Sequence, residues 1–291
     1  MTELTTIDQS RAEYDSLPFV NPSLLMYATK SLKHFRAAQL GDITSDTSDA
    51  KQLGDFSHKA LLEPHIDLTK EVKRQMLEPG TTDFAIWTGK VRNGRAWAEF
   101  QEDNAEKTII RQQDLDAAYD RAKTAITVSK AVLANTTAAA LLEGTKTEQT
   151  VTCELCEVMC KGRMDAYKPG VIVDLKTCRD PSNYAFGKQC AQLRYNVRLG
   201  CYRAFVEAVN GQRPEVWLIA AETSPPYDVA VYRPPEQFLD NGWLVAEKAL
   251  KAIAEAERTD YWPGVCESSE ILYVPNWAME EQEADLVDWG A

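Results

Sequence analysis

The sequence lacks a long apolar run and lacks the usual beginning of an exported protein. No segment approaches the roughly 20 consecutive apolar residues that span a bilayer. The start, MTELTTIDQSRAEYD, does not show the basic-then-apolar order of a signal peptide. We therefore expect a cytoplasmic location. The 291 residues, 44% hydrophobic and 26% charged, are enough to bury a substantial core.

Positive charge is also in short supply, since the formal net charge is -12. This balance argues against a surface that coats nucleic acid uniformly, although a focused basic groove is compatible with an acidic exterior. Part of the excess lies at the end, where MEEQEADLVDWGA carries five carboxylates and neither lysine nor arginine. We interpret this tail as a solvated segment.

Cysteine is present in an odd number, seven, which favours reduced thiols in a chain without an export signal. Cys153, Cys156 and Cys160 form a C-x2-C-x3-C string that suggests zinc or an iron–sulfur cluster. The three residues fall across a predicted hairpin, where alternate side chains face opposite sides, and the spacing is not typical of zinc sites. We expect structural thiols, with no zinc and no iron–sulfur cluster.

Apolar spacing predicts an α/β protein with a mixed central β-sheet flanked by helices. Residues 41–52 are predicted as a loop, and residues 65–106 as irregular structure with a short strand or helix. Helices are predicted over 21–39, 53–64, 107–143 (one long or two shorter), 179–209 and 234–259, and strands over 147–155, 157–167, 171–177, 215–223 and 227–234. We interpret residues 1–291 as a single domain with a mainly helical part (1–147), an α/β core (148–258) and a C-terminal extension (259–291).

Two acids and a lysine gather in the stretch GRMDAYKPGVIVDLKTC, residues 162–178. On a strand Asp174 and Lys176 share a face, and the turn at KPG brings the end of the strand carrying Asp165 beside the next strand. Two carboxylates suit Mg²⁺, and a neighbouring lysine can orient metal-bound water or stabilise the developing anion. The arrangement favours metal-assisted hydrolysis of a phosphodiester. From these residues alone, a surface ion pair at strand ends is the alternative.

The same region resembles the PD-(D/E)xK nuclease superfamily, and more narrowly the RecE-type (exonuclease VIII) double-strand DNA exonucleases of phage and prophage. The family pattern is a (K/R)-x-R-x-D strand, a turn, an apolar strand ending in D-x-K-T, and a helix with Y-x-x-Q-x-x-x-Y. Upstream, LGDFSHKALLEP is similar to the family's G-x-x-x-H-x-x-L-L-E-P helix, and TDYWPGVCESSEILYVPNWA resembles its closing segment. The resemblance covers roughly residues 20 to 280. The matching positions in the core are Lys161, Arg163, Asp165, Asp174, Lys176, Thr177, Tyr195 and Tyr202.

The resemblance implies a PD-(D/E)xK, restriction-endonuclease-like core and assigns roles to its residues. The catalytic residues would be Asp165, Asp174 and Lys176. The metal, Mg²⁺ with Mn²⁺ able to substitute, would be held by His58, Asp165, Asp174 and the backbone carbonyl of Leu175. Glu148 stands where the family also has an acid and is a candidate for a further metal contact.

The resemblance also points to residues that support the site or contact DNA, namely Arg163, Tyr195, Arg198 and Tyr202. Arg198 departs from the pattern, because the family has glutamine there. Arginine donates hydrogen bonds as glutamine does and adds a fixed charge that suits phosphate. Alternatively, Gln189 or Gln192 fills the role.

The function implied by the resemblance is that of a Mg²⁺-dependent exonuclease that digests one strand of linear double-stranded DNA, 5′ to 3′, in phage-type homologous recombination. The implied partners are double-stranded DNA ends, a single-strand annealing protein, and further copies of the chain in a ring-shaped trimer or tetramer, within the cytoplasm of a bacterial host. One alternative is another repair nuclease of the superfamily, specific for single strands or structures. The other is a catalytically inactive DNA-binding module.

Overall fold

A five-stranded mixed sheet lies at the centre of the computed structural model, which describes residues 10–43, 48–78 and 81–279. The strand order is β3-β4-β5-β6-β7, with β5 and β6 parallel and the other neighbours antiparallel. The strands are β3 (Lys146–Leu155), β4 (Val158–Lys168), β5 (Val171–Cys178), β6 (Glu215–Glu222) and β7 (Val229–Tyr232). The predicted α/β class with a mixed sheet is therefore confirmed.

Strand β5 lies inside the sheet and is buried over most of its length. Its parallel pairing with β6 requires a crossover, which α9 (Asn183–Gln192) and α10 (Tyr195–Asn210) provide. A strand covered on both faces reads as a continuous apolar run, as in VIVDL. Charged side chains in such a strand are costly to bury, so Asp174 and Lys176 stand out here.

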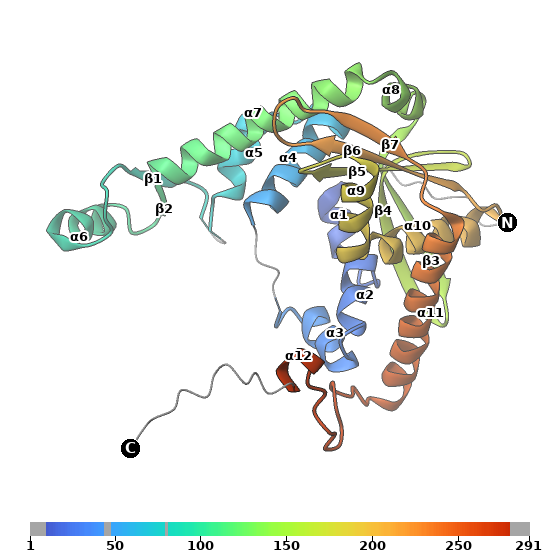
Figure 1. Ribbon diagram of the computed structural model, residues 1–291. Coiled ribbons are helices and arrows are strands. Elements are labelled where there is room, and N and C mark those ends of the chain that lie inside the picture. Colours follow the sequence, from blue (N-terminus) through green and yellow to red (C-terminus); the bar gives the residue numbers. More distant parts are fainter. Residues whose placement is uncertain (1–9, 44–47, 79–80, 280–291) are drawn as a thin grey trace, which may run out of the picture.

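Helices cover both faces of the sheet (Figure 1). One face packs against α10 and α11 (Glu236–Thr259), and the other against α4 (Asp49–Leu62), α7 (Gln112–Ala134) and α8 (Thr136–Leu142). Helices α10 and α11 cross closely, since a Cβ on Gly242 would lie 2.0 Å from the Asn196 carbonyl oxygen. Glycine is thus required at this crossing.

The N-terminal helices differ from the predictions in their boundaries. Residues 21–39 form two helices, α2 (Pro22–Ala28) and α3 (Leu32–Gln39), because Ser31 caps a new helix by accepting a hydrogen bond from the His34 amide. Helix α4 begins inside the predicted loop, where Ser48 accepts from the Lys51 amide. Helix α1 (Arg11–Ser16) precedes these helices, and α5 (Leu68–Gln75) follows them.

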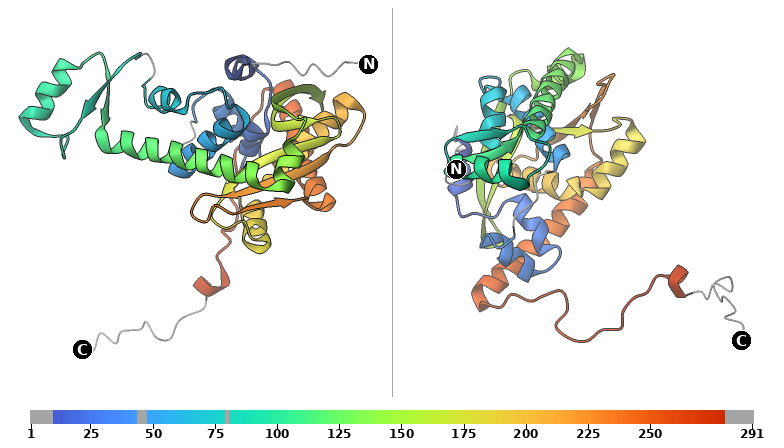
Figure 2. Two further views of the ribbon diagram at one scale, coloured as in Figure 1. Left: turned by 90° about the horizontal axis from the view of Figure 1, so that it is seen from above. Right: turned by 90° about the vertical axis from the view of Figure 1, so that its left-hand side faces the viewer.

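An arm projects from the N-terminal end of α7 (Figures 1 and 2). It comprises β1 (Phe84–Trp87), α6 (Gly94–Asp103) and β2 (Thr108–Arg111), with β1 and β2 paired in parallel. We call residues 84–111 the β1–α6 arm. The region 107–143, predicted as one or two helices, consists of β2 followed by the two helices α7 and α8.

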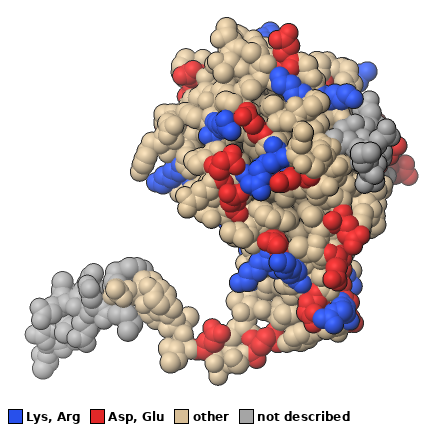
Figure 3. All heavy atoms as spheres, turned by 90° about the vertical axis from the view of Figure 1, so that its right-hand side faces the viewer, with Lys and Arg blue, Asp and Glu red and all other residues tan. Residues whose placement is uncertain are grey.

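The C-terminal extension leaves α11 and passes beside α3, where the Trp262 ring stacks on Phe35 with centroids 6.0 Å apart. The last element that the structure describes is α12 (Asn276–Met279), so nearly all of the acidic tail lies outside the described residues. On the face shown in Figure 3, acidic and basic side chains lie intermixed. Within the described residues no single helix is long and apolar enough to cross a membrane; only α7 and α8 together, bent by 90°, meet the length and composition criteria.

Candidate active site

Helix α4 and strands β4 and β5 bring His58, Asp165 and Leu175 to one point. His58 Nε2 lies 2.9 Å from the Leu175 carbonyl oxygen, and His58 Nδ1 lies 3.5 Å from Asp165 Oδ1. The Leu175 amide donates to Asp165 Oδ2 at 2.8 Å. The Asp165 carboxylate therefore links the histidine to the backbone of β5.

The position of α4 is fixed by its packing against α7. Phe56 and Leu62 of α4 are buried, and Ser129 of α7 donates to the carbonyl oxygen of Ala60 at 3.3 Å. Ala60 is two residues beyond His58 in the same helix. Contacts on both sides of the histidine thus hold it over β5.

Lys176 lies between the two aspartates. Its ammonium donates to the Leu175 carbonyl at 3.1 Å, forms an ion pair with Asp174, and lies 3.9 Å from Asp165 Oδ2. Asp174 is 1% exposed and Lys176 9%. Asp174 Oδ2 is the atom that contacts the Lys176 ammonium, and no other hydrogen-bond donor reaches it within the described part of the chain. A buried carboxylate oxygen is therefore left with capacity to accept a further ligand.

The two aspartates do not lie at strand ends, as the sequence suggested. Strand β4 continues past Asp165 to Lys168, and the turn to β5 contains only Pro169 and Gly170. Pairing of Ala166 with Val173 sets Asp165 beside Asp174 in the middle of the sheet. The alternative of a solvated ion pair at strand ends is therefore wrong, because the acids are largely buried.

Glu148 completes a cluster of possible metal ligands. One ligand atom each from His58, Glu148 and Asp165 lies within 4.8 Å of the others. In the β3–β4 ladder Thr147 pairs with Ala166, and the pairing resumes at Gln149 with Met164. Glu148 therefore lies opposite Asp165. Glu148 has a φ of 52°, a left-handed conformation that is unfavourable for a residue other than glycine. Strained residues of this kind concentrate at functional sites.

Burial and neighbouring charge shift the pKa values of these groups in different directions. Burial raises the pKa of Asp174 and that of Glu148. At Asp165 burial acts in the same direction, but the charges of His58 and Lys176 outweigh it and lower the pKa. At His58 burial lowers the pKa, and the Asp165 carboxylate outweighs that effect and raises it. Asp165 is thus held as the anion, while the other two acids would gain from a bound cation.

The donor chemistry fits a hard divalent cation. The carboxylates, the Leu175 carbonyl and one imidazole nitrogen are ligands that Mg²⁺ or Mn²⁺ accepts. Asp174 Oδ2 is buried and contacts the Lys176 ammonium, and a carboxylate oxygen has a second lone pair that such a cation could use. Arg163 donates to Glu148 at 2.5 Å and supplies a positive charge at the edge of the cluster.

Gln189 and Arg198 occupy different places around the lysine. Gln189 donates to Tyr195 Oη and to the Thr177 carbonyl, both at 3.2 Å, and Lys176 lies 5.5 Å from the centroid of the Tyr195 ring. Arg198 donates to a serine of α2 instead, at 3.2 Å. Of the two glutamine alternatives, Gln189 is therefore the one beside the lysine strand, since Gln192 is exposed. Tyr202 of the same helix packs against the glycine at position 162, where an added Cβ would lie 3.1 Å from its ring.

Helix α1 is a part of the site region that sequence reasoning missed. Lys161 is 4% exposed and donates to the carbonyl oxygens of Tyr14 and Leu17, both at 2.7 Å. The Tyr14 ring lies 4.5 Å from the Lys161 ammonium and 5.9 Å from the Arg163 guanidinium. Lys161 therefore connects the N-terminal segment to β4. This contact is long-range, so no local sequence pattern predicts it.

The cysteine string lies apart from the acids. Cys153 pairs with Cys160 across the β3–β4 ladder, and Cys156 occupies the turn. Burial raises the pKa of Cys153 and of Cys160 to about 12, so both thiols are protonated near neutral pH when no metal is bound. Structural thiols remain our prediction for them.

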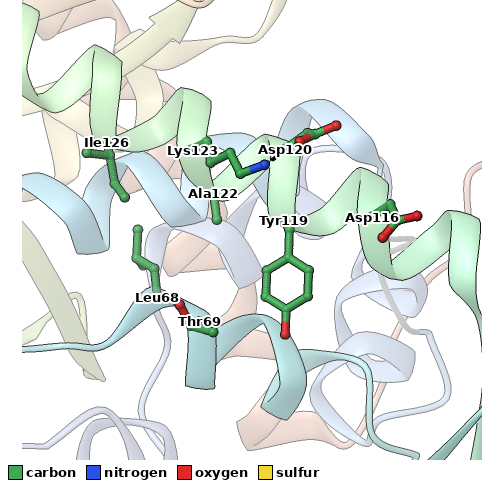
Figure 4. A pocket seen from close by; sticks show the side chains of 8 residues that line it. All are labelled: Leu68, Thr69, Asp116, Tyr119, Asp120, Ala122, Lys123 and Ile126. Carbon is green, nitrogen blue, oxygen red and sulfur yellow. Dashed lines mark hydrogen bonds and ion pairs between the residues drawn. The ribbon is translucent and has the colours of Figure 1, made fainter.

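A pocket of about 430 Å³ lies elsewhere, between α5 and α7 (Figure 4). Its wall includes Leu68, Tyr119 and Ile126, and none of its lining residues belongs to the cluster around Asp165.

The model of the family described as "PDDEXK-like domain of unknown function (DUF3799)" matches residues 22–274. The chain belongs to this family. This assignment confirms the predicted superfamily and its fold, while the narrower RecE-type identity stays a prediction. A comparison with curated proteins finds no significant match.

One solved structure shares the fold of this DUF3799 chain. A crystal structure of a candidate exonuclease from Eubacterium rectale superposes with a TM-score of 0.59 at 15% identity, covering 92% of this chain and 96% of the other. A second structure, SSO0001, gives a TM-score of 0.30 at 14% identity over 64% of this chain and 83% of its own, too low to support any conclusion. The first likeness supports the fold.

Proposed function

We propose that this protein is a divalent-metal-dependent exodeoxyribonuclease that digests one strand of linear double-stranded DNA. The observation that carries the proposal is the meeting of His58, Asp165 and the Leu175 carbonyl beside Lys176. Metal ligands and a catalytic lysine at one point are what phosphodiester hydrolysis needs. The name of the Eubacterium rectale neighbour, a candidate exonuclease, is in keeping with this choice.

Each residue has a chemical role in the proposed reaction. His58, Asp165, Asp174 and the Leu175 carbonyl would hold the cation, with Glu148 as a further ligand. When bound, the cation would acidify a water molecule and offset charge that develops on the phosphate. Lys176 is held by carbonyl and carboxylate contacts, so its ammonium is fixed where it can orient that water or stabilise the developing oxyanion.

Several finer features of the proposal come from the motif resemblance. They are Mg²⁺ as the usual metal with Mn²⁺ as a substitute, digestion from 5′ to 3′, and a role in phage-type recombination in a bacterial host cell. The proposed partners are double-stranded DNA ends, a single-strand annealing protein, and other copies of the chain in a trimeric or tetrameric ring. Arg163, Tyr195, Arg198 and Tyr202 are proposed to support the site or contact DNA.

The test is digestion of linear duplex labelled at either the 5′ or the 3′ end, compared with closed circular duplex. We expect Mg²⁺-dependent loss of the 5′ label, no attack on closed circles, and no reaction in EDTA. Asp174→Ala or Lys176→Ala should lower the rate by at least about 100-fold. Lys130→Ala, at an exposed position on α7, is the matched control.

Each other outcome identifies a different function. Cleavage of closed circles or of single strands would favour another type of nuclease. Full activity of Lys176→Ala would show that Lys176 is not catalytic and would contradict the proposed function. DNA binding without hydrolysis in Mg²⁺ or Mn²⁺ would favour a DNA-binding module that has lost catalysis.

A further inference from the structure

Helix α1 lies beside the candidate active site, although it precedes the region that the family model matches. That model begins at residue 22, whereas α1 spans Arg11–Ser16. A capping box of Ser10 and Glu13 fixes the start of the helix. After the helix, the Val20 amide donates to the Met159 carbonyl at 2.9 Å and so joins the chain to β4. The family pattern therefore assigns no role to α1, yet the structure holds it in a defined place.

Tyr14 is the buried residue of α1, and its ring contacts cations from two elements. The side chain lies under the helix, and the residue is 7% exposed. The Lys161 ammonium and the Arg163 guanidinium, both from β4, lie 4.5 Å and 5.9 Å from the ring centroid. Arg11 of α1 lies at 5.8 Å. Cations within about 6 Å of an aromatic ring are attracted to it, more strongly where water is excluded.

Arg163 connects Tyr14 to the cluster of candidate metal ligands. Its guanidinium donates to Glu148 Oε2 at 2.5 Å, and the side chains of the pair are 9% and 19% exposed. Glu148 has a ligand atom within 4.8 Å of those of His58 and Asp165. A continuous series of contacts therefore runs from α1 through the arginine to a candidate metal ligand.

The position of Glu148 depends on its neighbours. Its φ of 52° is unfavourable for a residue other than glycine, so the surrounding structure must hold it there. Arg163 contacts Oε2 of the carboxylate, and the other oxygen stays available to a cation. An arginine free to turn away would leave the carboxylate without this orientation.

We propose that Tyr14 is a positioning residue for the metal centre, because its ring holds the Arg163 guanidinium in the orientation that directs the Glu148 carboxylate towards His58 and Asp165. This inference rests on the proposed function and adds to it a residue outside the matched family region. A guanidinium is planar and donates its hydrogen bonds in fixed directions. A ring packed against it therefore limits where it can donate.

The alternative is that Tyr14 serves only to pack α1 against the body of the protein. Lys161 already anchors this helix without using the ring, since it donates to the backbone carbonyls of Tyr14 and Leu17, both at 2.7 Å. The contact that the ring adds is the one with Arg163. The two explanations differ in one respect, namely whether the effect of Tyr14 requires the Glu148 carboxylate.

The experiment measures Mn²⁺ binding to the full chain by isothermal titration calorimetry, without DNA. Tyr14→Leu keeps an apolar side chain but removes the ring, and we expect the Kd for Mn²⁺ to rise by about 5-fold. Tyr14→Phe keeps the ring and should bind Mn²⁺ as the wild type does. Tyr119→Leu removes a tyrosine from the pocket between α5 and α7, and as the matched control it should leave the Kd unchanged.

A double-mutant cycle with Glu148→Gln separates positioning from packing. If Tyr14 acts through the Glu148 carboxylate, adding Tyr14→Leu to Glu148→Gln should change the Kd by less than about 2-fold. An equal rise in both backgrounds would show that Tyr14 only supports the fold and would overturn the inference. An equal rise in Tyr14→Phe and Tyr14→Leu would also overturn it, because the hydroxyl and not the ring would then matter.

Arg163→Lys tests the same link if Tyr14→Leu unfolds α1, which hydrogen exchange in residues 10–20 would reveal. Lysine keeps the positive charge but lacks the flat guanidinium that packs on a ring. We expect the Kd for Mn²⁺ to rise by about 5-fold here too. Unchanged affinity in Arg163→Lys would overturn the inference.

Metal binding and DNA digestion separate this inference from the proposed function. If the wild type digests linear duplex and Tyr14→Leu binds Mn²⁺ normally, the positioning role alone is overturned. If the cycle shows the expected coupling and the wild type digests no DNA, the role of Tyr14 at the metal centre stands and the nuclease function is overturned. A wild type that binds no Mn²⁺ would overturn both.

Discussion

His58 Nε2 lies 2.9 Å from the carbonyl oxygen of Leu175, although 117 positions separate the two residues in the sequence. The contact joins α4, in the helical N-terminal part, to β5 at the centre of the sheet. Asp165 reinforces it from β4, through the Leu175 amide and the second nitrogen of the histidine. The N-terminal part of the chain is therefore an integral part of the candidate active site.

Replacement of His58 by alanine should weaken metal binding. The substitution removes one imidazole donor and the partner that keeps the pKa of Asp165 low. We expect the Kd for Mn²⁺, measured by isothermal titration calorimetry, to rise by at least about 10-fold. His34→Ala is the control, since the His34 ring contacts the Ser31 cap of α3. Unchanged Mn²⁺ binding in His58→Ala would remove the histidine from the ligand set.

The sequence predicted that Asp165 and Asp174 lie on neighbouring strands, and there is a physical reason for this. Strands β3 to β5 follow one another through tight turns, so period-two patterns and the KPG turn place Asp165 and Asp174 correctly on neighbouring strands. The approach of His58 could not be read from periodicity, because it depends on contacts between distant helices. It entered only through the resemblance.

The errors in the prediction have equally local causes. Apolar spacing continues across residues 29–31, so the break between α2 and α3 is hidden unless Ser31 is recognised as a cap. Residues 65–106, predicted as irregular structure with a short strand or helix, contain α5, β1 and α6. Helix α6 escapes prediction because it buries no face and therefore shows no core-facing stripe. Lys161 matched a family motif, yet its contact with α1 depends on a fold that local sequence does not encode.

Glu148 offers a test of the metal cluster. Glu148→Gln keeps the size of the side chain and its hydrogen bond to Arg163, but removes a charge that burial disfavours, as the raised pKa of Glu148 indicates. If the glutamate is a ligand, the Kd for Mn²⁺ should rise by about 10-fold while thermal stability stays equal or increases. Glu154→Gln, at an exposed position on the same strand, is the matched control. A variant with wild-type metal affinity would leave Glu148 as the ion-pair partner of Arg163 alone.

Lys161→Ala should loosen the N-terminal segment. The change removes the donor shared by the Tyr14 and Leu17 carbonyls and leaves these acceptors poorly satisfied. We expect the free energy of unfolding to fall by about 2 kcal/mol. Hydrogen exchange should rise in residues 10–20 more than in β4. Lys188→Ala, an exposed change on α9, should have neither effect. Equal exchange in the two variants would contradict the role assigned to Lys161.

Glu71 should make the stability of the protein depend on pH in the acid range. Burial raises its pKa, but hydrogen bonds from Arg74 and Lys59 outweigh that effect and lower the pKa from 4.5 to about 2. A lowered pKa in the folded state stabilises the protein above about pH 4.5, and this contribution is lost as the pH falls towards 2.

The difference in unfolding free energy between the wild type and Glu71→Gln should therefore be on the order of 2 kcal/mol at pH 7 and shrink steadily between pH 4.5 and pH 2. Urea unfolding at pH 7, 4 and 3 measures it. Glu99→Gln is the control, because the Arg95–Glu99 side chains are 91% and 58% exposed and their ion pair is screened by water. Lys59 follows His58 directly in α4, and the buried Phe56 and Leu62 hold this helix in place. We therefore expect the Mn²⁺ affinity of Glu71→Gln to stay near the wild-type value. A pH-independent difference in stability would show that the ion pairs of Glu71 contribute nothing beyond packing.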